Sequence, residues 1–330
     1  MRGRVLPVVL IVVMVLTLGL MISPPVAAVK GSYSGTNGKI AFSAPVNTHE
    51  AIFIMNADGT NIQQLTDGTK YDIHPSWSPD GTKIAFGRSV VGFADSTIWV
   101  MNSDGSGLRQ LTSGGYQTAP AWSPDGTKIM FDREGSGSND GIYVIDANGP
   151  TGPGTLLIAR GSSPSWSPDG TRIAFSSGDI KIANANTGTV IATLTSGSSP
   201  CWSPDGSKIV FDNYGTISVM NADGSGLTSL DVPGAQPNWS PDGTNFVFAT
   251  GGASVLIMNA DGSEVHDLTP TMPYARDPDW QRLPAASIGP VGGFVEPVNK
   301  LGTVAPYLAL FGVVAAVAVV VVKPWKKRET

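Results

Sequence analysis

Short segments that alternate apolar and polar residues recur through the middle of the chain, separated by turn-forming residues. Lys83-Ile84-Ala85-Phe86 and Thr97-Ile98-Trp99-Val100-Met101 have the two-residue period of half-buried β-strands. Similar pairs of segments return about every 40 residues, which is the period of a repeat architecture rather than of one continuous sheet. The pattern therefore predicts an all-β chain built from small repeated sheets.

Two turn motifs separate these strands. Trp-Ser-Pro-Asp-Gly occurs five times, and its copies begin 36 to 45 residues apart, at Trp77, Trp122, Trp166, Trp202 and Trp239. Its Pro fixes φ near −65° at the second turn position, and its Gly accepts the left-handed conformation that closes a hairpin. Asn-Ala-Asp-Gly and its variants supply the second turn, at 56–59, 102–105, 146–149, 184–188, 221–224 and 259–262.

The two motifs divide each repeat into four antiparallel strands, which we call A to D in chain order. Four-stranded repeats of this length predict a six-bladed β-propeller over residues 29–283. A last strand A at Trp280 has no following strands, whereas the first strands B, C and D, from Ile40 to Leu65, have no strand A. One blade is therefore expected to combine both ends of the repeat region and close the ring. An open β-sandwich is the alternative, but it needs neither a regular Trp nor shared terminal strands.

The chain ends have a different character. Residues 1–28 begin with Arg2 and Arg4, continue with an apolar run and end in Val26-Ala27-Ala28, which predicts a secretory signal peptide, with an uncleaved anchor as the alternative. Residues 284–303 show no strand or helix period and are expected to form a stalk. Residues 304–322 are uncharged and long enough for a transmembrane helix, and the basic tail 323–330 predicts a cytoplasmic C-terminus.

Charge and cysteine content limit the function classes. The chain has 21 basic and 26 acidic residues, of which the two ends hold six and one, so the region between them carries a net charge of −10. A nucleic-acid-binding surface needs a basic face, and this class is set aside. Cys201 is the only cysteine, so an intramolecular disulfide is excluded. It occupies a strand position held by small residues in other repeats, which favours a packing role.

The repeat Pro-x-Trp-Ser-Pro-Asp-Gly-Thr-Lys-Ile-Ala-Phe, followed by Ile-Tyr-Val-Met-Asn-Ala-Asp-Gly and Gln-Leu-Thr, resembles the propeller repeats of the TolB family. Similar repeats build the propeller domain of prolyl-oligopeptidase-type peptidases. The resemblance covers about residues 37–283 and implies an envelope propeller that binds protein partners. TolB-like proteins carry an extra α/β domain for which this chain has no room, so the TolB role itself is not carried over. The C-terminal end resembles the anchors of prokaryotic, especially archaeal, surface proteins.

Catalytic motifs are missing from the sequence. There is no Gly-x-Ser-x-Gly nucleophile elbow and no α/β-hydrolase pattern. The three histidines, His49, His74 and His266, lack the spacing of metal ligands, so no metal and no cofactor is expected. Oligogalacturonate lyases use a related propeller with a metal in the pore, which keeps an enzyme open as the alternative.

Strand direction predicts where a ligand binds. The short, uniform A–B and C–D turns lie on one face of the ring, and the variable B–C and D–A loops lie on the other. Residues of the D–A loops are expected to surround the mouth of the central channel, and the binding candidates there are Tyr71, Asp72, His74, Tyr116, Gln117, Arg276 and Asp277. The expected function is non-catalytic binding of a protein, peptide or glycan outside the cell, on a single-pass membrane anchor. The alternative is an envelope polysaccharide lyase or hydrolase that uses the same residues.

Overall fold

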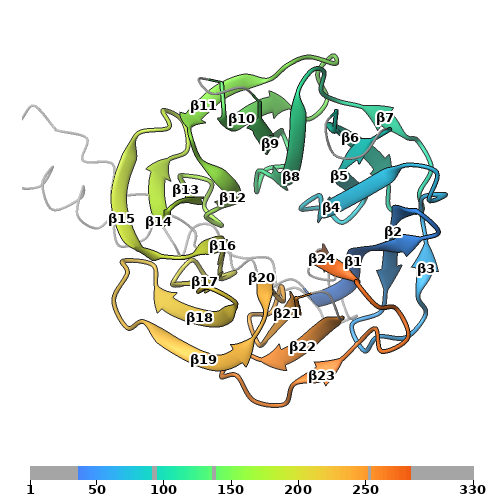
Figure 1. Cartoon of the computed structure of the whole chain (residues 1–330). Coiled ribbons are helices and arrows are strands. Elements are labelled where there is room, and N and C mark those ends of the chain that lie inside the picture. The colour runs from blue at the N-terminus through green and yellow to red at the C-terminus, as the bar shows by residue number, and fades with distance from the viewer. Residues whose placement is uncertain (1–35, 91–94, 136–138, 252–253, 284–330) are drawn as a thin grey trace, which may run out of the picture. The chain divides into compact units, whose positions relative to one another are not determined.

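The computed structural model describes residues 36–90, 95–135, 139–251 and 254–283. These residues form an all-β propeller of twenty-four strands around a central opening (Figure 1). By internal contacts the chain divides into Met1–Ala286 and Ser287–Thr330, and every described residue belongs to the first unit. The signal peptide, stalk, transmembrane helix and basic tail expected from the sequence lie outside the described residues. Within the described ranges, no helix is long and apolar enough to cross a membrane.

Four sheets are separate four-stranded blades, each antiparallel throughout. In chain order, the first of these four blades contains β8 (Tyr116–Trp122), β9 (Lys128–Glu134), β10 (Gly141–Asp146) and β11 (Thr155–Ala159). The second contains β12 (Ser162–Trp166), β13 (Arg172–Ser177), β14 (Asp179–Asn184) and β15 (Val190–Ser196). The third contains β16 (Ser198–Trp202), β17 (Lys208–Asp212), β18 (Thr216–Asn221) and β19 (Thr228–Pro233). The fourth contains β20 (Ala235–Trp239), β21 (Asn245–Ala249), β22 (Val255–Asn259) and β23 (His266–Asp267).

The other eight strands form one sheet, which corrects the expectation of six separate blades. Its strands are β24 (Arg276–Leu283), β1 (Thr36–Val46), β2 (His49–Met55), β3 (Gln63–Gln64), β4 (Tyr71–Trp77), β5 (Lys83–Ser89), β6 (Thr97–Asn102) and β7 (Arg109–Gln110). The group from β24 to β3 and the group from β4 to β7 meet at one parallel pair, Glu50 with Tyr71. Because β2 extends well beyond the two-residue β3, its edge at Glu50 is left open for β4.

The ends of the repeat region close the ring. β1 pairs antiparallel with β24, with Thr36 opposite Leu283 and Ile40 opposite Trp280. The predicted sharing of strands between the two ends is therefore confirmed. We call the side where the innermost strands begin the loop face, and the side where they end, at the Ser-Pro-Asp-Gly turns, the turn face. Both ends of the paired strands, Thr36 and Leu283, lie at the turn face.

The Ser-Pro-Asp-Gly turn is held by its own side chains and also joins adjacent blades. Ser78 Oγ donates to Asp80 Oδ1 (2.6 Å) and accepts from the Lys83 N–H (2.9 Å). A side-chain carbon added at Gly126, in the next copy, would lie 3.3 Å from Pro79 Cγ. Since Gly126 has φ +69°, glycine serves both the turn and the contact between blades.

The second turn motif joins the blades farther from the channel. Gly59, Gly105, Gly224 and Gly262 each lie against a Leu of a neighbouring outermost segment: Leu268, Leu65, Leu194 and Leu230. The strand-B phenylalanines Phe42, Phe86, Phe131, Phe175, Phe211 and Phe248 are fully buried. Burying a Phe side chain contributes roughly 1.5–3 kcal/mol, so this repeated residue supplies much of the core.

Candidate functional site

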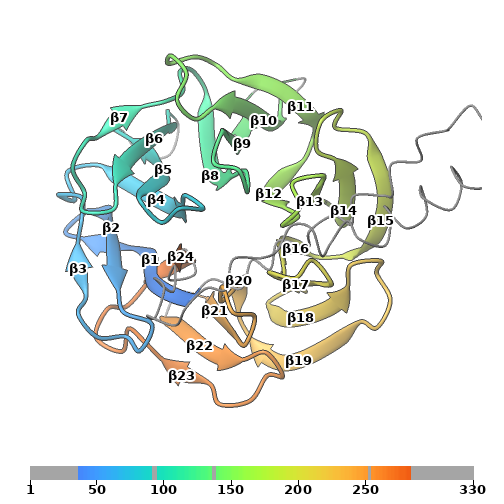
Figure 2. The same ribbon diagram turned by 180° about the vertical axis from the view of Figure 1, so that it is seen from behind.

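The innermost strands β4, β8, β12, β16, β20 and β24 line the central channel, as the view from behind also shows (Figure 2). A cavity of about 250 Å³ runs between them. Each of these strands departs from regular pairing with its neighbour next to the Pro of its Pro-x-Trp sequence. Such a bulge turns a side chain out of the ladder, so the channel wall is shaped by the same irregularity in every strand.

The residue before this Pro has a left-handed backbone in all six strands. These pre-proline residues are His74 (φ 53°), Ala119 (47°), Ser163 (50°), Ser199 (50°), Gln236 (53°) and Asp277 (55°). Left-handed φ is uncommon for residues other than Gly and costs free energy unless the surroundings hold it. The six residues form one ring around the channel, with His74, Gln236 and Asp277 together on one side and small residues on the other.

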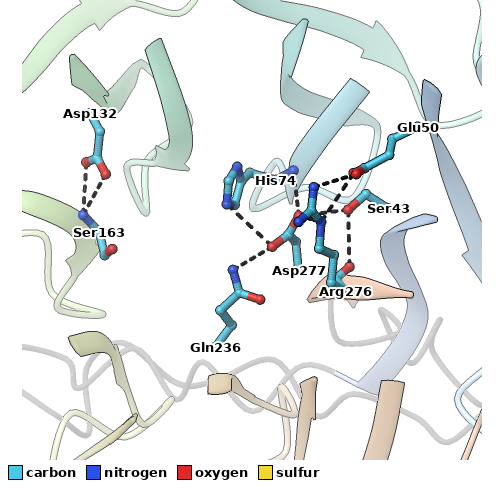
Figure 3. A network of polar contacts seen from close by, with 8 residues as sticks. All are labelled: Ser43, Glu50, His74, Asp132, Ser163, Gln236, Arg276 and Asp277. Atoms are coloured by element: carbon cyan, nitrogen blue, oxygen red, sulfur yellow. Dashed lines mark hydrogen bonds and ion pairs between the residues drawn. The ribbon is translucent and has the colours of Figure 1, made fainter. Parts of the chain in front are cut away.

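Asp277 is the centre of a polar cluster on that side (Figure 3). Its Oδ2 accepts from Ser43 Oγ (2.7 Å) and from the His74 backbone N–H (3.3 Å). Its Oδ1 accepts from Gln236 Nε2 (2.5 Å) and lies 3.4 Å from His74 Nε2. Arg276 Nε is 3.7 Å from Oδ2. One carboxylate therefore links the pre-proline residues of three adjacent innermost strands.

The surroundings of Asp277 keep it ionised. Burial would raise the pKa of this carboxyl, but His74, Arg276 and the hydrogen bonds from Ser43 and the His74 backbone outweigh burial. The pKa of Asp277 consequently lies below its usual value. Arg276 also donates to Glu50, with 2.5 Å between Nη2 and Oε1, and this pair fastens β24 to β2.

A second buried carboxyl, Asp132, lies across the channel, where both of its oxygens accept from the Ser163 N–H at 2.9 Å (Figure 3). Burial raises its pKa to about 8, the Ser163 hydrogen bond opposes the rise, and Glu134 adds to it. No cation pairs with Asp132 among the described residues. At neutral pH, Asp132 therefore contacts the Ser163 N–H of β12 in its protonated, neutral form.

A second ring of residues lies deeper in the channel and is formed by the residue that follows the Pro in each innermost strand. This ring also joins neighbouring innermost strands. Asp279 Oδ2 accepts from the Trp77 N–H (2.7 Å), and Oδ1 accepts from Asn238 Nδ2 (2.6 Å). Burial raises the pKa of Asp279 to about 6, against the effect of these hydrogen bonds and of Arg282. Burial also raises the pKa of the Cys201 thiol in this ring to about 11, so Cys201 is not a thiolate nucleophile.

Comparison with known proteins supports the reading of the repeats. No family model matches the chain. Over 58 residues the chain is 41% identical to the Tol-Pal system protein TolB of Geobacter metallireducens, and the match covers 18% of this chain and 14% of that protein. The fold resembles TolB from Acinetobacter baumannii with a TM-score of 0.62 and 22% identity, over 76% of this chain and 67% of that one. TolB from Agrobacterium tumefaciens gives a TM-score of 0.57 and 18% identity, over 75% and 99%.

The propeller is TolB-like. Because the curated match spans only 14% of its relative, the likeness concerns the repeats and the fold they build.

Of the seven residues predicted to surround the channel, the TolB-like propeller brings three together: His74, Arg276 and Asp277. Tyr116 is half-buried. Burial and Glu134 raise the pKa of its hydroxyl. Arg276, Asp132 and Asp277 also act on this pKa, which places Tyr116 near the cluster. Tyr71 is half-buried at the start of β4, where its ring lies 4.7 Å from that of His49.

Asp72 and Gln117 do not line the channel, contrary to the prediction. Asp72 is fully buried and forms a two-bond ion pair with Arg88, at 2.6 and 2.8 Å. Gln117 is fully buried and bonds Thr112 and the carbonyls of Ser113 and Gly114. Asp72 and Gln117 lie two residues before the channel-facing His74 and Ala119, so strict alternation would place them on the same face. The irregular pairing that begins after Ile73 and after Thr118 changes the side-chain direction between the two positions.

The prediction also missed residues of the polar cluster around Asp277. Gln236, Ser43 and Glu50 belong to it but were not among the candidates. For Gln236 a signal was present in the sequence, because it precedes Pro237 as His74 precedes Pro75. The others sit on strands B and C, and only the register between strands places them near the channel.

The cluster offers charged and hydrogen-bonding side chains that can hold a ligand. His74 Nε2 faces Asp277, and its buried Nδ1 has no hydrogen-bond partner in the described part of the chain, so no nucleophile is paired with this imidazole. Asp277 is held ionised and already accepts several hydrogen bonds, which does not suit a general acid. In the same described ranges, no three His, Cys, Asp or Glu side chains are grouped as metal ligands.

Proposed function

We propose that this TolB-like propeller is a non-catalytic binding module, displayed outside the cytoplasm, that holds a segment of a protein or peptide partner at the loop-face mouth of its channel. The observation that carries the proposal is the uneven chemistry of the ring of pre-proline residues. One side holds the Asp277 carboxylate with the polar side chains of His74 and Gln236, and the other side holds only small residues. A rigid ring with one polar side orients an asymmetric ligand. A glycan is the alternative ligand.

A partner of protein type agrees with the relatives. The curated relative is named as a protein of the Tol-Pal system. A channel wall made of paired strands has little freedom to move, so little binding free energy is lost in ordering the site when a ligand binds.

We read the eight-stranded sheet as two blades joined at Glu50 and Tyr71, which gives a six-bladed ring. The two groups have separate innermost strands, β24 and β4, and separate outermost strands, β3 and β7. The single parallel pair between them is a small fraction of the hydrogen bonds within either group.

Residues 304–322 anchor the chain in the membrane in this proposal, after export directed by residues 1–28. The described chain begins at Thr36 and ends at Leu283, and these two residues pair at the turn face.

Recovery of a partner without turnover is the test that separates binding from catalysis. The full chain, tagged after Thr330 and purified from native envelope, should carry a stoichiometric envelope polypeptide. Envelope polysaccharide incubated with the same preparation and divalent metal should remain intact. Polysaccharide cleavage that is lost in a His74→Ala variant would establish the alternative, an envelope lyase or hydrolase.

A further inference from the structure

The outermost strands of the propeller are unequal in length, and β15, the longest of them, has an edge without a charge or a proline, as does the shorter β11. β3, β7 and β23 have two residues each, whereas β11 has five, β19 has six and β15 has seven. Short edge strands are a common protection against unwanted pairing, and so are charges and prolines on the edge. β19 carries Asp231 and Pro233, but β15 (Val-Ile-Ala-Thr-Leu-Thr-Ser) has neither a charge nor a proline.

Exposed apolar side chains accompany the open edge of β15. Val190 is 46% exposed and Ile191 is 58% exposed, on opposite sides of the strand. Leu156, on the outermost strand of the neighbouring blade, is 40% exposed. Gly188, just before β15, packs so closely on Leu157 that a side-chain carbon there would overlap the Leu157 carbonyl oxygen. The contact of Gly188 with Leu157 therefore brings the start of β15 close to β11 at the seam between two blades.

We propose that β15 is a homotypic docking edge, through which two copies of this chain pair antiparallel and join their blades into one continuous sheet. An uncharged strand paired with its own copy brings no like charges together, whatever the register. The pairing would satisfy the outward N–H and C=O groups of β15 and cover Val190 and Ile191.

The direction of the strand fits this arrangement. The outermost strands run along the perimeter of the ring when it is viewed down the channel (Figure 1). Rotation by 180° about an axis parallel to the channel reverses a strand that runs along the perimeter, so two copies with the same face up meet antiparallel. Copies anchored in one membrane stand the same way up, a step that rests on the proposed function.

Cysteine cross-linking of the full chain in native membranes tests the proposal. In a Cys201→Ser background, single cysteines at each of the seven β15 positions (190–196) are compared with single cysteines at the six β19 positions (228–233). Because a residue forms a disulfide with its own copy only when it lies beside the two-fold axis, linked dimers are expected at one or two adjacent β15 positions and at none on β19. Adding Ile191→Lys, or Thr193→Lys where position 191 itself cross-links, should lower the dimer yield about tenfold, because a charge is then placed on the paired edge.

Equal cross-linking on β15 and β19, or none on β15, would overturn the proposal. A cross-link from β15 to a different polypeptide would also overturn it and would assign the edge to another partner. Ile191 is exposed, so an unchanged melting temperature of the Ile191→Lys chain excludes unfolding as the cause of a lost dimer. The same cross-links in detergent, together with a reversed membrane orientation, would support the edge while rejecting the anchoring.

Discussion

The residues that decide the character of the channel are buried carboxyl groups whose partners come from neighbouring blades. Asp277 is ionised because His74, Arg276 and Ser43 surround it, whereas Asp132 has only one backbone N–H and stays protonated. The same side chain thus serves as a fixed charge on one side of the channel and as a neutral group on the other. The difference follows from partners rather than from burial, since both groups are buried.

The raised pKa of Asp132 predicts how stability depends on pH. The unfolded carboxyl titrates near 3.8 and the folded one near 8, so between these values the unfolded chain has lost a proton that the folded chain keeps. Stability from this group therefore falls as pH rises through that window and levels off above it. The side chain at position 132 cannot ionise in the Asp132→Asn variant. The melting temperature of this variant, relative to that of the parent chain, should therefore rise as the pH rises from about 5 to about 9.

An opposite case serves as the control. The pKa of the exposed Asp104 is lowered by hydrogen bonds from Ser106, so its contribution is complete above its unfolded value and is lost only in acid. The Asp104→Asn variant should consequently show a difference from the parent that stays constant over the same pH range. A margin for Asp132→Asn that does not change with pH would contradict the account of Asp132.

At the scale of single elements, the two turn motifs close hairpins and also pack blade against blade. In four of its five copies, the Gly of Ser-Pro-Asp-Gly lies beside the Pro of a neighbouring copy, whereas Gly81 lies beside Gln281 and Arg282. In five of its six copies, the Gly of the second motif lies beside a Leu of a neighbouring outermost segment. The repeated glycines are thus needed for contacts between blades as well as for their positive φ. This double demand accounts for the regularity of the motifs.

Two glycines with nearly equal backbone angles separate these demands. Gly188 (φ +69°) packs on Leu157, and Gly178 (φ +75°) has no atom within 4 Å of an added side-chain carbon. Gly178→Ala should cost only the conformational penalty of about 1–2 kcal/mol. Gly188→Ala should cost several kcal/mol more in thermal or denaturant unfolding. Equal losses in the two variants would show that the turn conformation alone matters.

The sequence was sufficient for most of the elements but not for the site. Turn chemistry and the period of two predicted the strands and the closure of the ring at Ile40 and Trp280, because both are local or repeated signals. The side-chain direction of Asp72 and Gln117 depends on a bulge two residues away, and sequence alone did not reveal it. Glu50 and Asp132 reach the channel clusters through strand register, which no local pattern encodes.

At the scale of the whole molecule, the ring depends on its shared sheet. Deletion of residues 277–283 removes most of β24, the buried Trp280 and the carboxylates of Asp277 and Asp279, and leaves β1 with one partner. The loss should be several kcal/mol, since a ladder, a large side chain and a polar cluster go together. An unchanged melting temperature of the full chain carrying this deletion would rule out closure by β24.

The orientation across the membrane is a second prediction for the whole molecule. If residues 304–322 span the bilayer, the propeller lies outside and the basic tail lies inside. Protease added to intact cells should remove the propeller and spare a tag placed after Thr330. Digestion of the tag with protection of the propeller would reverse the orientation.

The most direct test of the account compares binding by two folded double variants with the partner recovered from the envelope. Tyr116→Ala with Arg276→Ala alters the loop-face mouth of the channel, where losing such anchors typically costs about 2 kcal/mol or more. Asn102→Ala with Asn221→Ala alters the turn face, where both side chains bond only to nearby serines, Ser106 and Ser225. In a binding titration, the loop-face variant should lose the partner and the turn-face variant should keep the parent's affinity. Loss of binding in the turn-face variant, with full binding in the loop-face variant, would contradict the central claim.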